Sequence, residues 1–175
     1  MTIYRGSGGV NHEVKQQYRG LSGVNRQIKE QHRGVGGANR KVFAGLWTVS
    51  DEGSNIILQD SRRLSMKSST YTTMKAYRAN ANGKIRVLYT IEDNWDTGSK
   101  ARLDVNGVAT GPEVFARGWN AANSATATLT IKEGDIIEIK AYTYNPYGQS
   151  AAIVTLVQFI GTATGGDGDV FSILT

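Results

Sequence analysis

A fourteen-residue pattern occurs three times at the start of the chain. The copies begin at Tyr4, Tyr18 and His32; in each, an arginine follows directly and an asparagine stands seven residues after the first position. A unit this short cannot bury a core of its own, so each copy must pack against its neighbours or against another molecule. Residues 1–45 are therefore predicted to form an arm that docks, which points to assembly rather than catalysis.

Each copy of the repeat has the pattern of a short β-hairpin. Val10, His12 and Val14 alternate with polar residues, as expected for an extended chain with two different faces. A pair of small, glycine-containing residues gives a turn signal in every copy, at positions 8–9, 22–23 and 36–37. A helix through Val10, Val14 and Tyr18 is the alternative, but glycine pairs at every repeat argue against it.

The positive charge of the chain lies in this arm. Residues 1–45 carry eight lysines and arginines against Glu13 and Glu30, a net charge of +6, whereas residues 46–175 have a net charge of −1. A basic arm suits an acidic protein surface or nucleic acid, and we favour protein docking. The predicted docking residues are Tyr4, Arg5, Tyr18, Arg19, His32, Arg33 and Arg40.

The rest of the chain is predicted to be all-β. Residues 46–73 look like a connector with short strands, and residues 74–161 contain several alternating segments without a helical period between them. Asn106–Gly107 is the strongest hairpin signal. We therefore expect an antiparallel β-sandwich of the jelly-roll kind over 74–161. Residues 162–175 form a tail whose apolar end needs a sheet edge or a partner surface.

Signals for catalysis, metals or cofactors are weak. The chain has no cysteine and two histidines, His12 and His32, neither of which has a second ligand at metal spacing. The acidic run at 92–96 suits calcium in composition but lacks an EF-hand spacing, so a solvated loop is expected. No apolar run approaches the ~20 residues of a membrane span, and the N-terminus does not resemble a signal peptide. We predict no enzyme, no metal and no cofactor.

Aromatic residues in the predicted loops have two interpretations. Trp95, Trp119, Tyr144 and Tyr147 stand beside polar residues such as Asp96. Exposed rings next to amides and carboxylates suit the apolar faces and hydroxyls of sugars. The alternative, which the sequence favours for Trp95 and Trp119, is that the rings plug the ends of the sandwich. These five residues are the candidate glycan or receptor contacts.

The repeat resembles one that opens minor structural proteins, often tail-associated, of phages and prophages of Gram-positive bacteria. That pattern is of the type Tyr-x-Gly-Val-x-Gly-x-x-Arg-Lys-Val-Lys, and the matching stretches here are 4–15, 18–29 and 32–42, about a quarter of the chain. His32 departs from the usual aromatic residue. The resemblance implies a virion structural protein, assembled in the host cytoplasm, whose partners are other virion proteins.

Together these observations predict a non-enzymatic virion protein of a phage or a phage-derived particle. The arm would dock on the tail, baseplate or fibre, and the sandwich would be displayed for host-surface binding, with a glycan as the expected ligand. A homo-oligomer is expected, because hairpin edges favour pairing between chains. The alternatives are a capsid decoration or head-fibre protein, a nucleic-acid-binding protein and, least favoured, a glycan-active enzyme. Such an enzyme needs two carboxyl groups about 5–10 Å apart, for which Asp93 and Asp96 are candidates.

Overall fold

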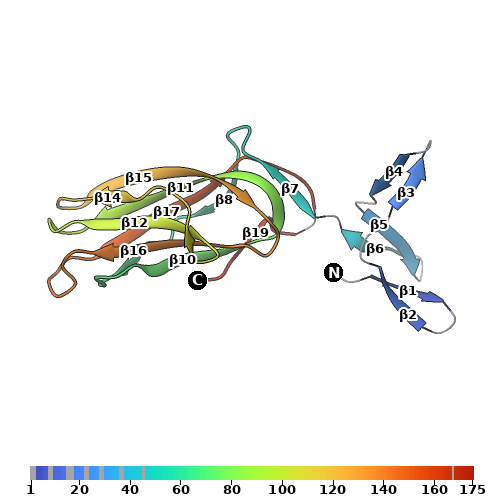
Figure 1. Ribbon diagram of the computed structural model, residues 1–175, viewed down its shortest axis with the longest axis horizontal. Helices are drawn as coiled ribbons and strands as arrows, with labels where there is room; N and C mark the ends of the chain where they lie inside the picture. Colours follow the sequence, from blue (N-terminus) through green and yellow to red (C-terminus); the bar gives the residue numbers. More distant parts are fainter. Residues whose placement is uncertain are drawn as a thin grey trace. The chain divides into compact units, whose positions relative to one another are not determined.

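The computed structural model describes residues 46–166 and 168–175 with their side chains and, within residues 1–45, the backbone of six strands. The chain divides into two units, residues 1–46 with 165–168 and residues 47–164 with 169–175, and each is described by itself. Every regular element in the described residues is a β-strand (Figure 1). The predicted all-β class is therefore confirmed.

The strands of the arm form three separate antiparallel hairpins, one in each copy of the repeat. The turn signals at 8–9, 22–23 and 36–37 lie outside the described residues. The paired strands are β1 (Ile3–Ser7) with β2 (Val10–Val14), β3 (Tyr18–Leu21) with β4 (Val24–Gln27), and β5 (Glu30–Val35) with β6 (Ala38–Ala44).

Two sheets form the sandwich, as predicted. The first sheet has the order β13 (Val108–Ala109), β12 (Ser99–Val105), β16 (Ile136–Thr143), β10 (Thr72–Ala79) and β19 (Phe171–Ile173), with β14 (Val114–Ala116) also on β12. The second has the order β18 (Thr162–Gly165), β7 (Trp47–Ser50), β11 (Ala81–Asp93), β17 (Ala152–Ile160) and β8 (Ile56–Asp60). Two further strands join it, β15 (Ala121–Ile131) on β11 and β9 (Leu64–Met66) on β17.

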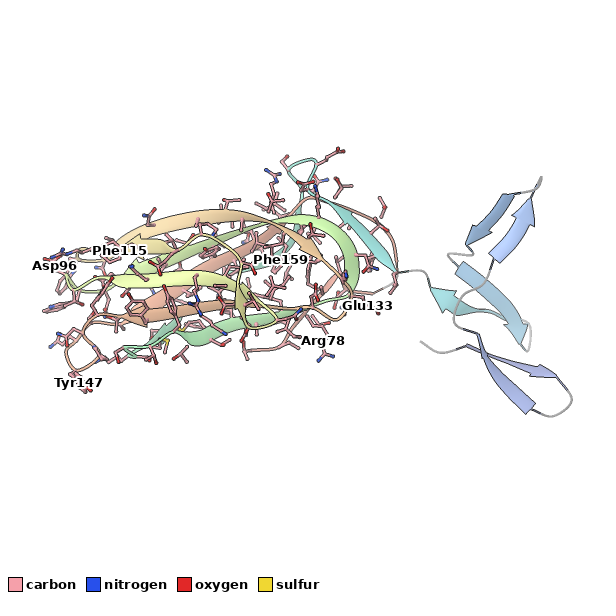
Figure 2. The ribbon with its side chains drawn as sticks, in the orientation of Figure 1. Arg78, Asp96, Phe115, Glu133, Tyr147 and Phe159 are labelled. Atoms are coloured by element: carbon pink, nitrogen blue, oxygen red, sulfur yellow. The ribbon has the colours of Figure 1, made fainter. Side chains whose placement is uncertain are left out.

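Alternation along the strands builds the core between the sheets. In β11 the residues Ile85, Val87, Tyr89 and Ile91 are fully buried, while the residues between them are partly exposed. Successive side chains of a strand point to opposite faces, so this period of two places one face of β11 inside the sandwich. Phe159 of β17 lies in the same core (Figure 2).

The sandwich takes strands from beyond the predicted range 74–161. In the segment expected as a connector, β7, β8 and β9 are hydrogen-bonded into the second sheet. Their short apolar stretches cannot satisfy their backbone groups alone, and a sheet edge does so. At the other end of the chain β19 pairs with β10, which confirms that the apolar terminus needs a sheet edge.

Strand β7 fixes where the chain enters the sandwich. It runs parallel to the first residues of β11, with Trp47 opposite Ala81 and Val49 opposite Gly83. The approach is close, because a Cβ atom at Gly83 would lie 1.9 Å from the carbonyl oxygen of Val49. Since β11 then runs to Asp93 at the far end, the chain enters the sandwich at the end opposite the loop that follows Asp93.

Candidate functional site

Three loops meet at one end of the sandwich because the strands that flank them end together. In the second sheet the last residue of β11, Asp93, pairs with Ala121 at the start of β15 and with Ala152 at the start of β17. In the first sheet the first residue of β12, Ser99, pairs with Ala116 and Thr143, where β14 and β16 end. The loops 94–98, 117–120 and 144–151 therefore share this end, which we call the loop end.

Figure 2 shows the loop end through three labelled residues, Asp96, Phe115 and Tyr147. Arg78 and Glu133 lie toward the other end of the sandwich in the same view.

A buried carboxylate forms the floor of the loop end. The Asp93 side chain accepts hydrogen bonds from the backbone N–H of Gly98 at 2.9 Å and from the hydroxyls of Ser99 and Ser150, each at 3.2 Å. Asp93 is fully buried, and all three donors are neutral. These bonds tie the loop 94–98 to the loop 144–151. The expectation of a solvated acidic loop is therefore wrong at Asp93, because its oxygens are used inside the protein.

Further hydrogen bonds fix the two loops above this floor. The Asn94 side chain donates to the carbonyl of Gln149 at 3.2 Å and accepts from the N–H of Ala151 at 2.6 Å. Lys67 donates to the carbonyl of Gly148 at 2.8 Å. A loop held at several points has little conformational freedom left to lose when a ligand binds.

Two tryptophans lie in contact at the surface of the loop end. The rings of Trp95, in loop 94–98, and Trp119, in loop 117–120, have centroids 4.5 Å apart and planes inclined at 50°. Their exposed fractions are 36% and 65%. Because neither side chain is buried, the expectation that these rings plug the sandwich is wrong, and part of each ring is accessible to a ligand.

Two further aromatic residues, Phe115 and Tyr144, also lie at the loop end. Phe115, at the end of β14, packs edge-to-face with Tyr144, with ring centroids 6.0 Å apart. Both pack against Gly98, where a Cβ atom would lie 2.7 Å from the Phe115 ring. Tyr144 was predicted as a contact, whereas Phe115 was not. Its position three residues before the Gly118–Trp119 turn was the available signal. Tyr147 is almost fully exposed, at 98%.

Polar groups flank these rings. Asp96 and Arg117 approach to 3.9 Å between Oδ1 and Nε, and both side chains are largely exposed. Lys100 pairs with Glu113 at 2.5 Å, and the hydrogen bond from Lys100 holds the pKa of the Glu113 carboxyl below its usual range. The loop end thus offers carboxylate and guanidinium groups beside open aromatic faces, a set of groups that suits hydroxyl-rich ligands.

The geometry argues against a hydrolytic pair made of Asp93 and Asp96. Asp96 is exposed, but Asp93 is fully buried beneath the loops, with its oxygens already hydrogen-bonded. Within the described part of the chain, no group of three or more histidine, aspartate or glutamate side chains is placed to hold a metal ion. The same residues contain no helix long and apolar enough to cross a membrane.

The predicted docking residues of the arm lie in β1, β3, β5 and β6 and are placed by their backbone. A pocket of about 300 Å³ lies elsewhere in the sandwich, between β8 and β19. Its lining residues are Ile57, Leu58, Asp169, Val170, Phe171 and Ile173. Most of these residues are apolar, and the pocket belongs to neither predicted site.

Comparison with known proteins finds solved structures of similar fold but no matching family. No family model and no curated protein sequence matches the chain. Among solved structures, it is similar to the C-terminal domain of EclA, a sugar-binding protein, with 10% identity over 60% of this chain and 79% of that one and a TM-score of 0.43. It is also similar to the CBM35 domain of Abf62 from Cellvibrio japonicus, with 12% identity over 70% of this chain and 97% of that one and a TM-score of 0.35. At these scores the likenesses carry no argument about function, which has to rest on the loop end itself.

Proposed function

We propose that the sandwich is a non-enzymatic carbohydrate-binding domain that holds a glycan at the loop end. The observation that carries this proposal is the exposed contact pair of Trp95 and Trp119. Aromatic faces stack on the apolar faces of sugar rings, and Asp96 and Arg117 offer hydrogen-bonding groups beside them. The buried Asp93 network supports the proposal, because a site organised before binding loses less entropy on binding.

We further propose that the protein is a virion component that displays this domain, with the arm docked on the particle. The three-fold repeat, its resemblance to phage minor structural proteins and the arm's net charge of +6 support this role. The position of Trp47 also supports it, because the chain enters the sandwich at the end opposite the loop end. Several copies on one particle would convert weak single-site binding into avidity.

A glycan array probed with the full chain tests the binding proposal. Trp119→Ala is expected to weaken binding to the glycans found by at least about tenfold, because stacked rings dominate such contacts. Val108→Ala is the matched control, since Val108 is 67% exposed, close to the 65% of Trp119, but lies in the β12–β13 hairpin at the opposite end. Equal binding by wild type and Trp119→Ala would refute the proposed site. Release of new reducing ends from a bound glycan would refute the non-enzymatic assignment.

Deletion of residues 1–45 tests the anchoring proposal. Loss of the protein from particles, with glycan binding retained, is the expected result. Retention on particles would refute anchoring through the arm. Loss of salt-sensitive DNA binding without loss of incorporation would favour the nucleic-acid alternative.

A further inference from the structure

Cationic residues or histidine recur every seven positions through the arm, which is half the period of the repeat. Each copy therefore carries two of them. The positions are Arg5, His12, Arg19, Arg26, Arg33 and Arg40.

The hairpin register brings the two members of each copy together. Arg5 is the Cα partner of His12 in β1–β2, Arg19 of Arg26 in β3–β4, and Arg33 of Arg40 in β5–β6. The same juxtaposition thus occurs at the equivalent position of each hairpin. It places arginine opposite arginine in the second and third hairpins, and arginine opposite histidine in the first. We call Arg19–Arg26 and Arg33–Arg40 the cross-strand cation pairs.

Such pairs are unfavourable in an isolated hairpin. Like charges directly opposite one another destabilise a strand pair, and arginine does not lose its proton in proteins. The two acidic residues of the six strands do not relieve this, since Glu13 is the register partner of Tyr4 and Glu30 that of Ala44. A two-stranded hairpin is marginal even without such repulsion. An anion from outside would remove the cost.

We propose that each cross-strand cation pair binds a carboxylate of an acidic protein surface, and that hairpin formation and docking are coupled. This inference rests on the proposed anchoring role of the arm and specifies the chemistry of its partner. Arginine forms strong, often bidentate hydrogen bonds with carboxylates. Two separate sites, one in the second repeat and one in the third, suit discrete acidic groups on a protein. A nucleic-acid backbone instead carries one phosphate charge per ~1.7 Å.

Charge reversal of one member of each pair gives a test with two opposite readouts. In the full chain, Arg26→Glu with Arg40→Glu converts two cation pairs into Arg–Glu pairs. The variant is expected to gain amide-exchange protection in residues 18–44, because opposite charges across a strand pair are stabilising. It is also expected to bind poly-L-glutamate at least about tenfold more weakly than wild type, because the anion site is lost.

The matched control is Lys15→Glu with Lys29→Glu, which changes the net charge of the arm equally without altering a cation pair. It is expected to weaken poly-L-glutamate binding much less and to bring no gain in protection. An equal loss of poly-L-glutamate binding in the charge-reversed variant and the control would overturn the role of the pairs. The absence of any gain in amide-exchange protection in the charge-reversed variant would also overturn it. Tighter binding of wild type to a DNA duplex than to poly-L-glutamate, with the same sensitivity to charge reversal, would overturn the protein partner.

Particle incorporation separates this inference from the anchoring proposal. If deletion of residues 1–45 removes the protein from particles but the charge-reversed variant is incorporated normally, anchoring stands and the cation pairs are overturned. If the deletion has no effect, anchoring itself fails. The inference is supported if the deletion and the charge-reversed variant are both lost from particles while the control variant is incorporated normally.

Discussion

Two of the buried aspartates of the sandwich, Asp60 and Asp93, have similar exposure and opposite surroundings. Asp60, at the end of β8, accepts hydrogen bonds from Arg62 at 2.7 Å and from the hydroxyl of Tyr77 at 2.8 Å, and it lies 3.4 Å from the ammonium group of Lys75. Asp93, below the loop end, has neutral donors instead. Charged side chains therefore lie next to the Asp60 carboxylate, whereas the Asp93 carboxylate has only neutral donors from the loops and their flanks.

The difference separates a site that stabilises the fold from one that shapes a surface. Burial raises the pKa of Asp60, but hydrogen bonds from Arg62 and Tyr77 outweigh it and hold that pKa well below its usual range. Arg62 also donates to the carbonyl of Thr175, so the Asp60 cluster ties β8 and β10 to the end of the chain. The donors to Asp93 belong to the loops 94–98 and 144–151 or lie next to them. A substitution of Asp93 is therefore expected to change ligand binding.

The largest effect is expected at the Asp60 cluster. Asp60→Ala leaves the ammonium group of Lys75, a fully buried residue, without its carboxylate. Removal of one partner from a buried ion pair costs about 3–5 kcal/mol of unfolding free energy. Urea denaturation measures it, and the double variant Asp60→Ala with Lys75→Met is expected to recover part of the loss. A cost below about 1 kcal/mol would contradict the account.

A smaller loss of stability, with a larger effect on the ligand, is expected from Asp93→Ala. The variant leaves donors of Gly98, Ser99 and Ser150 without their acceptor, which costs about 1–3 kcal/mol. Because the loops lose their shared anchor, glycan affinity is expected to fall about tenfold. Isothermal titration of variants that remain folded measures this. An Asp60→Ala variant that lost more glycan affinity than Asp93→Ala would break the proposed division between the two sites.

Local sequence patterns do not single out Asp60 or Lys75, and they mark Asp93 only as part of an acidic run. The all-β class, the sandwich and the Asn106–Gly107 hairpin followed from alternation and turn chemistry, and the positive φ angles of that turn fit it. The buried Lys75 did not follow, because a register irregularity between Thr73 and Lys75 interrupts the simple alternation of β10. A bulge changes which face later side chains occupy.

Sequence patterns marked most of the aromatic rings at the loop end, although not Phe115. They did not indicate the hydrogen bonds that hold the loops. Trp95, Trp119 and Tyr144 stood out as aromatic residues in polar loops. The bond between Asp93 and Ser150 joins residues 57 positions apart, so it depends on which strands pair. No local pattern carries that information. For the same reason the pairing of β7 with β11 was not foreseen.

The acid sensitivity of the Asp60 carboxylate gives a further test. The folded-state pKa of Asp60 lies below its ordinary value of 3.8, so the unfolded chain binds its proton more readily. Its stabilising contribution is therefore complete above about pH 5 and is lost as the pH falls below that value. The stability difference between wild type and Asp60→Asn, measured by thermal unfolding, is expected to shrink from pH 7 to about pH 3. A difference that does not change with pH would contradict this.

The smallest effect is expected from the exposed ion pair at the loop end. Arg117→Ala breaks the 3.9 Å contact with Asp96. Such exposed pairs contribute less than about 0.5 kcal/mol, so the melting temperature is expected to stay unchanged. Glycan affinity is the informative measurement: a decrease would assign Arg117 a direct role in binding, and Val108→Ala again serves as the control.

The distribution of tryptophans in the chain allows the most direct test of the glycan site. The chain has three, Trp47, Trp95 and Trp119, and Trp47 lies at the opposite end of the sandwich from the other two. We would titrate the ¹⁵N-labelled full chain with a glycan selected on the array and follow the three indole N–H signals by NMR. We expect the Trp95 and Trp119 signals to shift while that of Trp47 stays in place. Saturable binding that leaves the Trp95 and Trp119 signals unchanged would contradict the proposed glycan site.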